Sequence, residues 1–336
     1  MKKRFYKPGI LPQIIIAVLL LLICCIVSIT YGAKAVGYSD IWGALFDAAA
    51  DSFNVNVVRA RIPRTLFGII AGASLATAGC MMQSITRNPI ADPSILGVNT
   101  GASLFVVFGI AFFNITSKQS YILLAFAGAM LTAFLVYGLA SIGNGGATPM
   151  KLALAGTAAS TALQSLVNTI MLPDTQVMDK FRFWQVGSIG GSTYEDIINL
   201  MPYFTFGMIL SIAMASQLNA LALGEEAATG LGVNVGLVRL ISAFAGVLLC
   251  ASTTALAGPI GFVGLMVPHI VRIFTGPDVR KIIPVGALFG ACLMVVADTL
   301  GRVLGSPGEI ESGIITALLG APIFIFIIRK GKVNAL

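Results

Sequence analysis

The chain has 336 residues, of which 57% are hydrophobic and only 10% charged, with 37 glycines and a net charge of +7. A soluble domain usually carries about a quarter charged residues, so this composition excludes a soluble enzyme. The basic excess does not indicate nucleic-acid binding, because no basic cluster is interleaved with aromatic residues. We therefore predict an all-α polytopic membrane protein in which residues 1–336 form a single transmembrane domain.

Apolar runs recur along the whole chain at about the 20-residue length that a bilayer-spanning helix needs. An even number of spans places both termini on one side, and most of the 21 basic residues, among them Lys2, Lys3 and Arg4, fall in segments on that side. The positive-inside rule then predicts cytoplasmic termini in a multi-pass protein of the cytoplasmic membrane, in contact with membrane lipid. The ten predicted spans are 11–31, 63–83, 94–113, 120–142, 152–172, 196–216, 238–257, 261–275, 282–303 and 310–328.

Arginines gather at the outer end of the second span, in Arg59-Ala-Arg61-Ile-Pro-Arg64. We expect the helix to begin near Pro63, since proline suits the first helical position. The planar guanidinium fork matches carboxylates, so Arg61 and Arg64 are candidate contacts for an acidic external partner. The alternative is that both side chains reach lipid phosphates at the interface.

The segment 79–97 is the most distinctive of the chain. Asn88-Pro89 and Asp92-Pro93 each favour a turn or a helix start, because Asn and Asp cap helices and proline follows well. We expect a rigid cytoplasmic bend between the second and third spans.

A polar stripe marks the fifth span. Ser160, Gln164 and Asn168 repeat every four residues, with Thr157 and Thr161 beside them. Polar groups at membrane depth usually face a bundle interior or a water-filled path. The stripe therefore predicts either a translocation path or hydrogen bonds between helices.

The loop 217–239 interrupts two long apolar runs with a polar segment that contains Glu225 and Glu226. It is predicted as two short helical pieces hinged by Gly230 and Gly232, since glycine permits a sharp turn at positive φ. This cytoplasmic loop is either a docking surface for a soluble partner or an ordinary connection.

Two segments near the C-terminal end carry further polar groups. His269 lies alone in the glycine-rich stretch 257–272, and a structural role is expected because one histidine makes neither a metal site nor a proton relay. Asp298 and Arg302 are four residues apart and predict an intrahelical pair. Alternatively, Arg302 joins Arg61 and Arg64 in an external basic patch.

Several chemical signatures are missing from the sequence. It contains no phosphate-binding loop of the G-x-x-x-x-G-K-[ST] type, no catalytic triad and no metal or dinucleotide motif. We therefore predict no cofactor and no enzymatic activity for this chain. An ion-coupled secondary transporter remains an alternative class, with Asp298 as its single acidic candidate.

A series of motifs extends along nearly the whole chain. They are Arg61-Ile-Pro-Arg64, Gln83 with the run 87–97, Leu223-Gly-Glu-Glu-Ala with Leu231-Gly-Val, the run 257–272, Gly276-Pro-Asp278, 297–302 and Gly320-Ala-Pro-Ile-Phe324. By these motifs the chain resembles the iron-siderophore, haem and cobalamin permease family of ABC importers, the FecCD type. One departure is Glu311, which stands where the family usually has the proline of Glu-Leu-Pro.

The resemblance implies a type II ABC importer permease that works with three kinds of protein partner. Two cytoplasmic ATPase subunits would dock on Leu223, Gly224, Glu225, Glu226, Gly230, Leu231 and Gly232, and an extracellular substrate-binding lipoprotein would dock on Arg61, Arg64 and Arg302. A second permease subunit, identical or different, would complete a path lined by Thr157, Ser160, Thr161, Gln164 and Asn168, with an inner gate at Thr148 and Pro149. Iron-siderophore import is the expected function, with haem or cobalamin import as the alternative.

Overall fold

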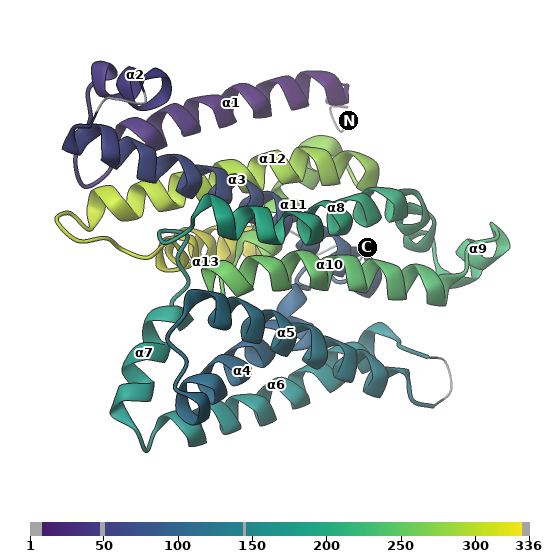
Figure 1. The fold of residues 1–336 in the computed structure, drawn as a ribbon. Coiled ribbons are helices and arrows are strands. Elements are labelled where there is room, and N and C mark those ends of the chain that lie inside the picture. Colours follow the sequence, from purple (N-terminus) through teal and green to yellow (C-terminus); the bar gives the residue numbers. More distant parts are fainter. Residues whose placement is uncertain (1–8, 48–50, 144–145, 331–336) are drawn as a thin grey trace.

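The computed structural model describes residues 9–47, 51–143 and 146–330, and every regular element in these ranges is a helix (Figure 1). The basic residues Lys2, Lys3 and Arg4, on which the predicted orientation draws, lie outside the described residues. Helices at the ten predicted spans are α1 (Ile10–Thr30), α3 (Phe53–Thr86), α4 (Val98–Phe113), α5 (Lys118–Ser141), α6 (Pro149–Met171), α8 (Tyr194–Ala222), α10 (Val235–Ala257), α11 (Val263–Thr275), α12 (Val279–Leu304) and α13 (Ser312–Lys330).

The helices differ in whether their length and hydropathy suffice to cross a bilayer. Six of those described, α1, α3, α5, α8, α10 and α12, are long and apolar enough to cross a bilayer, whereas α4, α11 and the first part of α13 are apolar but shorter. Four further short helices connect the spans: α2 (Tyr38–Phe46), the 3₁₀ turn η1 (Pro93–Leu96), α7 (Thr175–Gln185) and α9 (Glu225–Gly230). Of these, only α9 was expected as a separate piece.

Helix α3 begins ten residues earlier than predicted. Its N-terminal cap is Ser52, whose hydroxyl accepts a hydrogen bond from the Val55 backbone N–H at 3.2 Å, and Pro63 lies inside the helix. The prediction of a start near Pro63 was wrong because proline is also tolerated within a long helix whose neighbours support it. Arg61 and Arg64 consequently project from the third and fourth turns of α3 rather than from its end.

Glycine contacts bring α3 close to two neighbours at the centre of the molecule. A Cβ atom added to Gly72 would overlap the backbone of Gly290 in α12, and one added to Gly79 would overlap the carbonyl of Gly264 in α11. Small residues allow membrane helices to approach in this way, where van der Waals packing takes the place of the hydrophobic effect. Helix α3 therefore packs closely against both α11 and α12.

Replacing Gly79 with alanine is expected to destabilise the protein by about 1–3 kcal/mol, because the added methyl group overpacks a backbone contact that cannot yield. Thermal unfolding of the purified protein in detergent measures the effect. The control is Gly286→Ala in α12, a helical glycine with open space around its Cβ position. A Gly79→Ala variant as stable as this control would contradict the packing described for α3 and α11.

The predicted bend after α3 is present and is held by asparagine and aspartate side chains. Arg87 ends α3 in the left-handed region at φ 49°, and the Asn88 side chain accepts from the Ile90 N–H at 3.0 Å. Asp92 caps η1 by accepting from the Ser94 N–H at 2.9 Å. The short α11 has 13 residues, so it spans only about 20 Å, and it follows a non-helical segment at 258–262.

The molecule has two distinct ends (Figure 1). At one end α9 projects beyond α8 and α10, and at the other end lie α2, α7 and the turn between α12 and α13. Helices α4, α5 and α6 form a layer on one side of α10, and α6 lies at its outer edge.

Candidate functional site: two polar ends joined by a polar helix face

The segment between α8 and α10, residues 223–234, is here called the α9 connection. Gly224 and Gly232 provide its two sharp turns, at φ 122° and 81°, whereas Gly230 is the last residue of α9. Gly232 therefore turns the chain between the two predicted pieces, as expected, whereas the predicted hinge at Gly230 was wrong because Gly230 is helical. Gly224 adds a turn before α9 that was not expected. The second predicted helical piece is the first turn of α10, capped by Asn234, whose side chain accepts from the Leu237 N–H at 3.1 Å.

The two glutamates of α9 have different environments. Glu225 forms a 2.6 Å ion pair with Arg239, whose side chain is only 5% exposed at the start of α10. Glu226 is exposed, and among the described residues it forms no ion pair. Leu223 and Leu231 are also exposed, at 70% and 66%. The α9 connection thus presents one free carboxylate between two exposed leucines, while Glu225 is used to hold α9 on α10.

The last turn of α8, which leads into the α9 connection, is hydrogen-bonded to the end of α3 and the start of α12. The Arg87 guanidinium at the end of α3 donates to the Leu221 carbonyl at 2.6 Å. Asn219 of α8 donates to the Asp278 carboxylate at 2.6 Å and accepts from the Val279 N–H at 2.8 Å. Hydrogen bonds from Arg280 and then from Asn219 lower the pKa of Asp278 to about 2, so this cap of α12 stays charged at physiological pH.

At the opposite end, three arginines line a cavity of about 360 Å³, here called the arginine pocket. Their side chains are largely buried, and their donors bond within the chain. Arg61 donates to the carbonyls of Ile29, Thr30 and Lys34 at 2.7–3.2 Å. The residues lining the cavity are Ala33, Lys34, Phe53, Val57, Ala60, Arg61, Arg64, Gly190, Arg302, Ser306, Pro307 and Glu309.

Asp298 is the buried anion of this pocket. It accepts from Arg64 at 2.8 Å and from Arg302 at 3.0 Å, and its side chain is 2% exposed. The predicted intrahelical pair of Asp298 and Arg302 is therefore present, and Arg302 also joins Arg61 and Arg64. Arg64 has a second partner in Glu309, at 2.8 Å, whose side chain is 43% exposed. Sequence spacing indicated neither Glu309 nor the pairing of Arg64 with Asp298, which lies 234 residues away.

The polar stripe of the fifth span lies on α6. Thr157, Thr161 and Asn168 are exposed, whereas Ser160 and Gln164 are half-buried. The Gln164 amide donates to Asn168 at 3.2 Å within the helix, and the threonines donate to carbonyls four residues back. Ser165 and Thr169 extend the same exposed surface and were not predicted, although their spacing of four residues matches that of the stripe.

Helix α6 begins at the predicted inner gate. Thr148 is its N-cap and accepts from the Lys151 N–H at 3.4 Å, and Pro149 is its first residue. The Lys151 ammonium donates to the carbonyls of Ile142 and Gly146, at 3.0 and 3.3 Å, and so holds the preceding turn against the helix.

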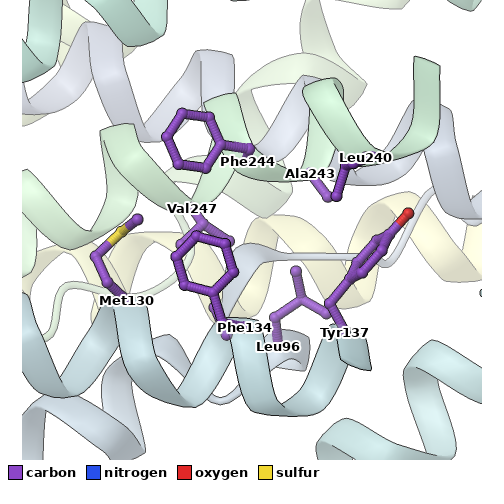
Figure 2. A pocket seen from close by; sticks show the side chains of 9 residues that line it. Leu96, Met130, Phe134, Tyr137, Leu240, Ala243, Phe244 and Val247 are labelled. Atoms are coloured by element: carbon purple, nitrogen blue, oxygen red, sulfur yellow. The ribbon is translucent and has the colours of Figure 1, made fainter. Parts of the chain in front are cut away.

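A crevice between α5 and α10 is too small for a cargo (Figure 2). Its volume is about 30 Å³, close to the share of one water molecule in the liquid. Figure 2 shows Phe134 and Phe244 pointing into it from the two helices, with the Tyr137 hydroxyl at its edge. The stripe on α6 takes no part in this crevice.

The protein-family model described as the FecCD transport family matches residues 20–330. The chain belongs to the FecCD transport family. It is 40% identical to the Fe(3+)-citrate import system permease protein YfmD of Bacillus subtilis (strain 168), over 96% of each chain. It is also 40% identical to the ferric enterobactin transport system permease protein FepD of Escherichia coli (strain K12), over 93% of each chain.

The fold agrees with this membership. A solved structure of a metal-chelate type ABC transporter in an inward-facing conformation matches with a TM-score of 0.84 at 28% identity, covering 96% of this chain and 100% of that one. This FecCD protein is therefore a membrane-embedded permease of the ABC importer type, a transport component rather than a catalytic enzyme.

Proposed function

We propose that this chain is the transmembrane permease subunit of an ATP-driven importer that moves a ferric siderophore across the cytoplasmic membrane by alternating access. The observation that carries the proposal is the pairing of two polar ends on one apolar helical body. The α9 connection lies at one end, the arginine pocket at the other, and the polar face of α6 runs along the body between them. The positive-inside rule puts the α9 end, and both termini, in the cytoplasm.

The α9 connection is the proposed dock for a cytoplasmic ATPase. Its exposed surface includes Leu223, Leu231 and Glu226, an apolar pair with a carboxylate that forms no ion pair among the described residues. Such a combination suits a protein interface, in which apolar area contributes affinity and a charge sets register. Gly224, Gly230 and Gly232 shape the connection, and Glu225 holds it through Arg239. ATP would bind to and be hydrolysed by two separate ATPase subunits, one for each permease subunit.

The polar face of α6 is the proposed wall of the translocation path, with Thr148 and Pro149 at its inner gate. An exposed row of hydroxyl and amide groups is costly against lipid, so a second permease subunit is expected to cover it and to enclose a water-filled path. The partner is a second copy of this chain or a related subunit. The weakly polar wall suits a cargo that is delivered by a binding protein and must also be released.

The arginine pocket is the proposed dock for the extracellular binding protein. Arg61, Arg64 and Arg302 are buried, so an incoming carboxylate has to enter the pocket and replace a carboxylate already there. Glu309 is the replaceable one, because its side chain is 43% exposed and Arg64 is its only ion-pair partner among the described residues. Asp298 is shared between two arginines and stays in place.

Substituting Glu309 with glutamine is expected to strengthen binding-protein docking by up to about tenfold, because a charged competitor for Arg64 is removed. The Kd of the purified binding protein for the permease in lipid nanodiscs is the measurement. Glu311→Gln is the matched control, since it makes the same charge change two residues away without touching the arginines. Equal or weaker docking of Glu309→Gln would contradict the exchange.

Uptake in iron-starved cells tests the function itself. Cells that lack the chain are expected to lose accumulation of radiolabelled ferric siderophore and to regain it when the chain is restored. The cargo is chosen because the relatives YfmD and FepD are named for ferric chelates. Haem and cobalamin serve as comparison cargoes, since hemin and cobalamin import permeases are also among the relatives. Loss of haem or cobalamin uptake alone would move the assignment to that cargo.

A further inference from the structure

Helix α2 carries an aromatic face that nothing in the described chain covers. Tyr38, Trp42, Leu45 and Phe46 follow one another at the spacing that places side chains on one side of a helix. They are 85%, 68%, 53% and 68% exposed, and the rings of Trp42 and Phe46 lie 4.4 Å apart. A row of large aromatic side chains left in water would be costly, so this face requires an occupant.

The opposite face of α2 is fixed to the protein. Asp40 accepts from the Asn54 side chain at 3.0 Å and from the Gly37 N–H at 3.3 Å. At the other end of α2, the Arg59 guanidinium donates to the Asp47 carbonyl at 2.9 Å. The only acidic side chain within α2 thus points toward α3, and the outward face carries no charge.

The position of α2 identifies the occupant. It follows α1, and the two helices meet at one end of the molecule (Figure 1). Only 11% of the most apolar stretch of α1 is buried, so α1 is surrounded mainly by lipid. The α2 face therefore continues the lipid-facing surface of α1 to the level where the bilayer ends. Tryptophan and tyrosine are enriched at that level, because an aromatic ring with a polar edge suits the headgroup region.

Helix α2 also adjoins the arginine pocket. The Lys34 ammonium lies 4.8 Å from the centre of the Phe53 ring, and both residues line the pocket on either side of α2 in the sequence. Arg59, bonded to the end of α2, precedes Arg61 and Arg64 by two and five residues on α3.

We propose that α2 is an interfacial helix whose aromatic face inserts among the phospholipid headgroups of the outer leaflet and holds the rim of the arginine pocket at that depth. Amphipathic helices bind this layer by burying an apolar face at the boundary of headgroups and acyl chains. A protein partner is the less suitable occupant, because the exposed side chains of this face are aromatic or aliphatic and lie next to α1, most of whose surface is left uncovered by the rest of the chain. The proposal rests on the orientation given under the proposed function, with α1 crossing the bilayer and the α9 end in the cytoplasm, and it does not depend on the cargo.

The two tryptophans of the chain make the proposal measurable, since Trp184→Phe leaves Trp42 as the single emitter. The full-length variant is reconstituted into phosphatidylcholine vesicles. Lipids brominated high on the acyl chain are expected to quench Trp42 about twofold more than lipids brominated near the chain end, and aqueous iodide is expected to quench it weakly. Phe46→Ser in the same background should increase iodide quenching, because it removes the stacked neighbour from the inserted face. Trp42→Phe reports Trp184 alone and provides the background.

Strong iodide quenching of Trp42 without quenching by brominated lipid would overturn the proposal and place α2 in water. Iodide protection that appears only after the purified binding protein is added would overturn it as well, by assigning the face to that protein. Quenching greatest for bromines at the chain end would also contradict it, because α2 would then lie in the bilayer core.

Discussion

A Glu226→Arg variant is expected to lose at least about tenfold in ferric-siderophore uptake and to release its ATPase during purification, while its level in the membrane stays normal. Glu226 is exposed on α9 and forms no ion pair within the described residues, so its reversal leaves the internal contacts intact. A positive charge at an interface built for a carboxylate costs several kcal/mol. Uptake in iron-starved cells and co-purification of the tagged ATPase are the two measurements.

Two variants separate docking from folding. Glu225→Arg places a second cation against the buried Arg239, so it is expected to lower the membrane level of the protein itself. Glu195→Arg makes the same charge reversal as Glu226→Arg at an exposed site in the first turn of α8, at the other end of the molecule, and should leave co-purification unchanged. Normal co-purification of Glu226→Arg would remove Glu226 from the proposed ATPase interface.

Asp298→Asn is expected to destabilise the protein by about 3–5 kcal/mol, the range found when one partner of a buried ion pair is removed. Asp298 neutralises Arg64 and Arg302 at once, and the side chains of all three are at most 10% exposed. Asparagine keeps the size of the side chain but leaves two buried guanidinium groups without their shared anion. Thermal unfolding in detergent, with the membrane level in cells, measures the loss.

The control for this substitution is Asp179→Asn in α7. Asp179 forms a pair with Arg182 at 3.6 Å on the surface, where both side chains are more than half exposed, and such pairs contribute little. Adding Arg302→Met to Asp298→Asn should recover part of the stability, because one uncompensated charge is removed. Wild-type stability of Asp298→Asn would show that the arginines do not depend on Asp298.

The architecture followed from the sequence to a large extent. Hydrophobic runs located ten helices because a bilayer offers backbone groups no hydrogen-bond partners, so each apolar run has to be helical. The bend at 87–97 followed from its Asn-Pro and Asp-Pro pairs, since capping is a local interaction between neighbouring residues. Family motifs spread over the chain pointed to the FecCD resemblance, which the family match over residues 20–330 confirms.

Local signals failed where two of them competed. Pro63 and Ser52 both mark possible helix starts, and the structure uses Ser52. Gly230 and Gly232 were both expected to turn the chain, and of these two only Gly232 has a positive φ. Helix α2 was not predicted, because hydropathy does not distinguish a nine-residue interfacial helix from an ordinary loop.

The sequence by itself determined which segments enter the membrane, because the transfer free energy of a side chain from water depends on its own chemistry and that of its neighbours in the run. Only the tertiary structure decided which charges meet. Arg64 reaches Asp298, 234 residues away, because glycines bring α3 and α12 into backbone contact. Glu225 forms an ion pair and Glu226 does not, because α10 places Arg239 beside Glu225. An ion pair depends on distance in space, and a linear pattern carries that distance only within a few turns of one helix.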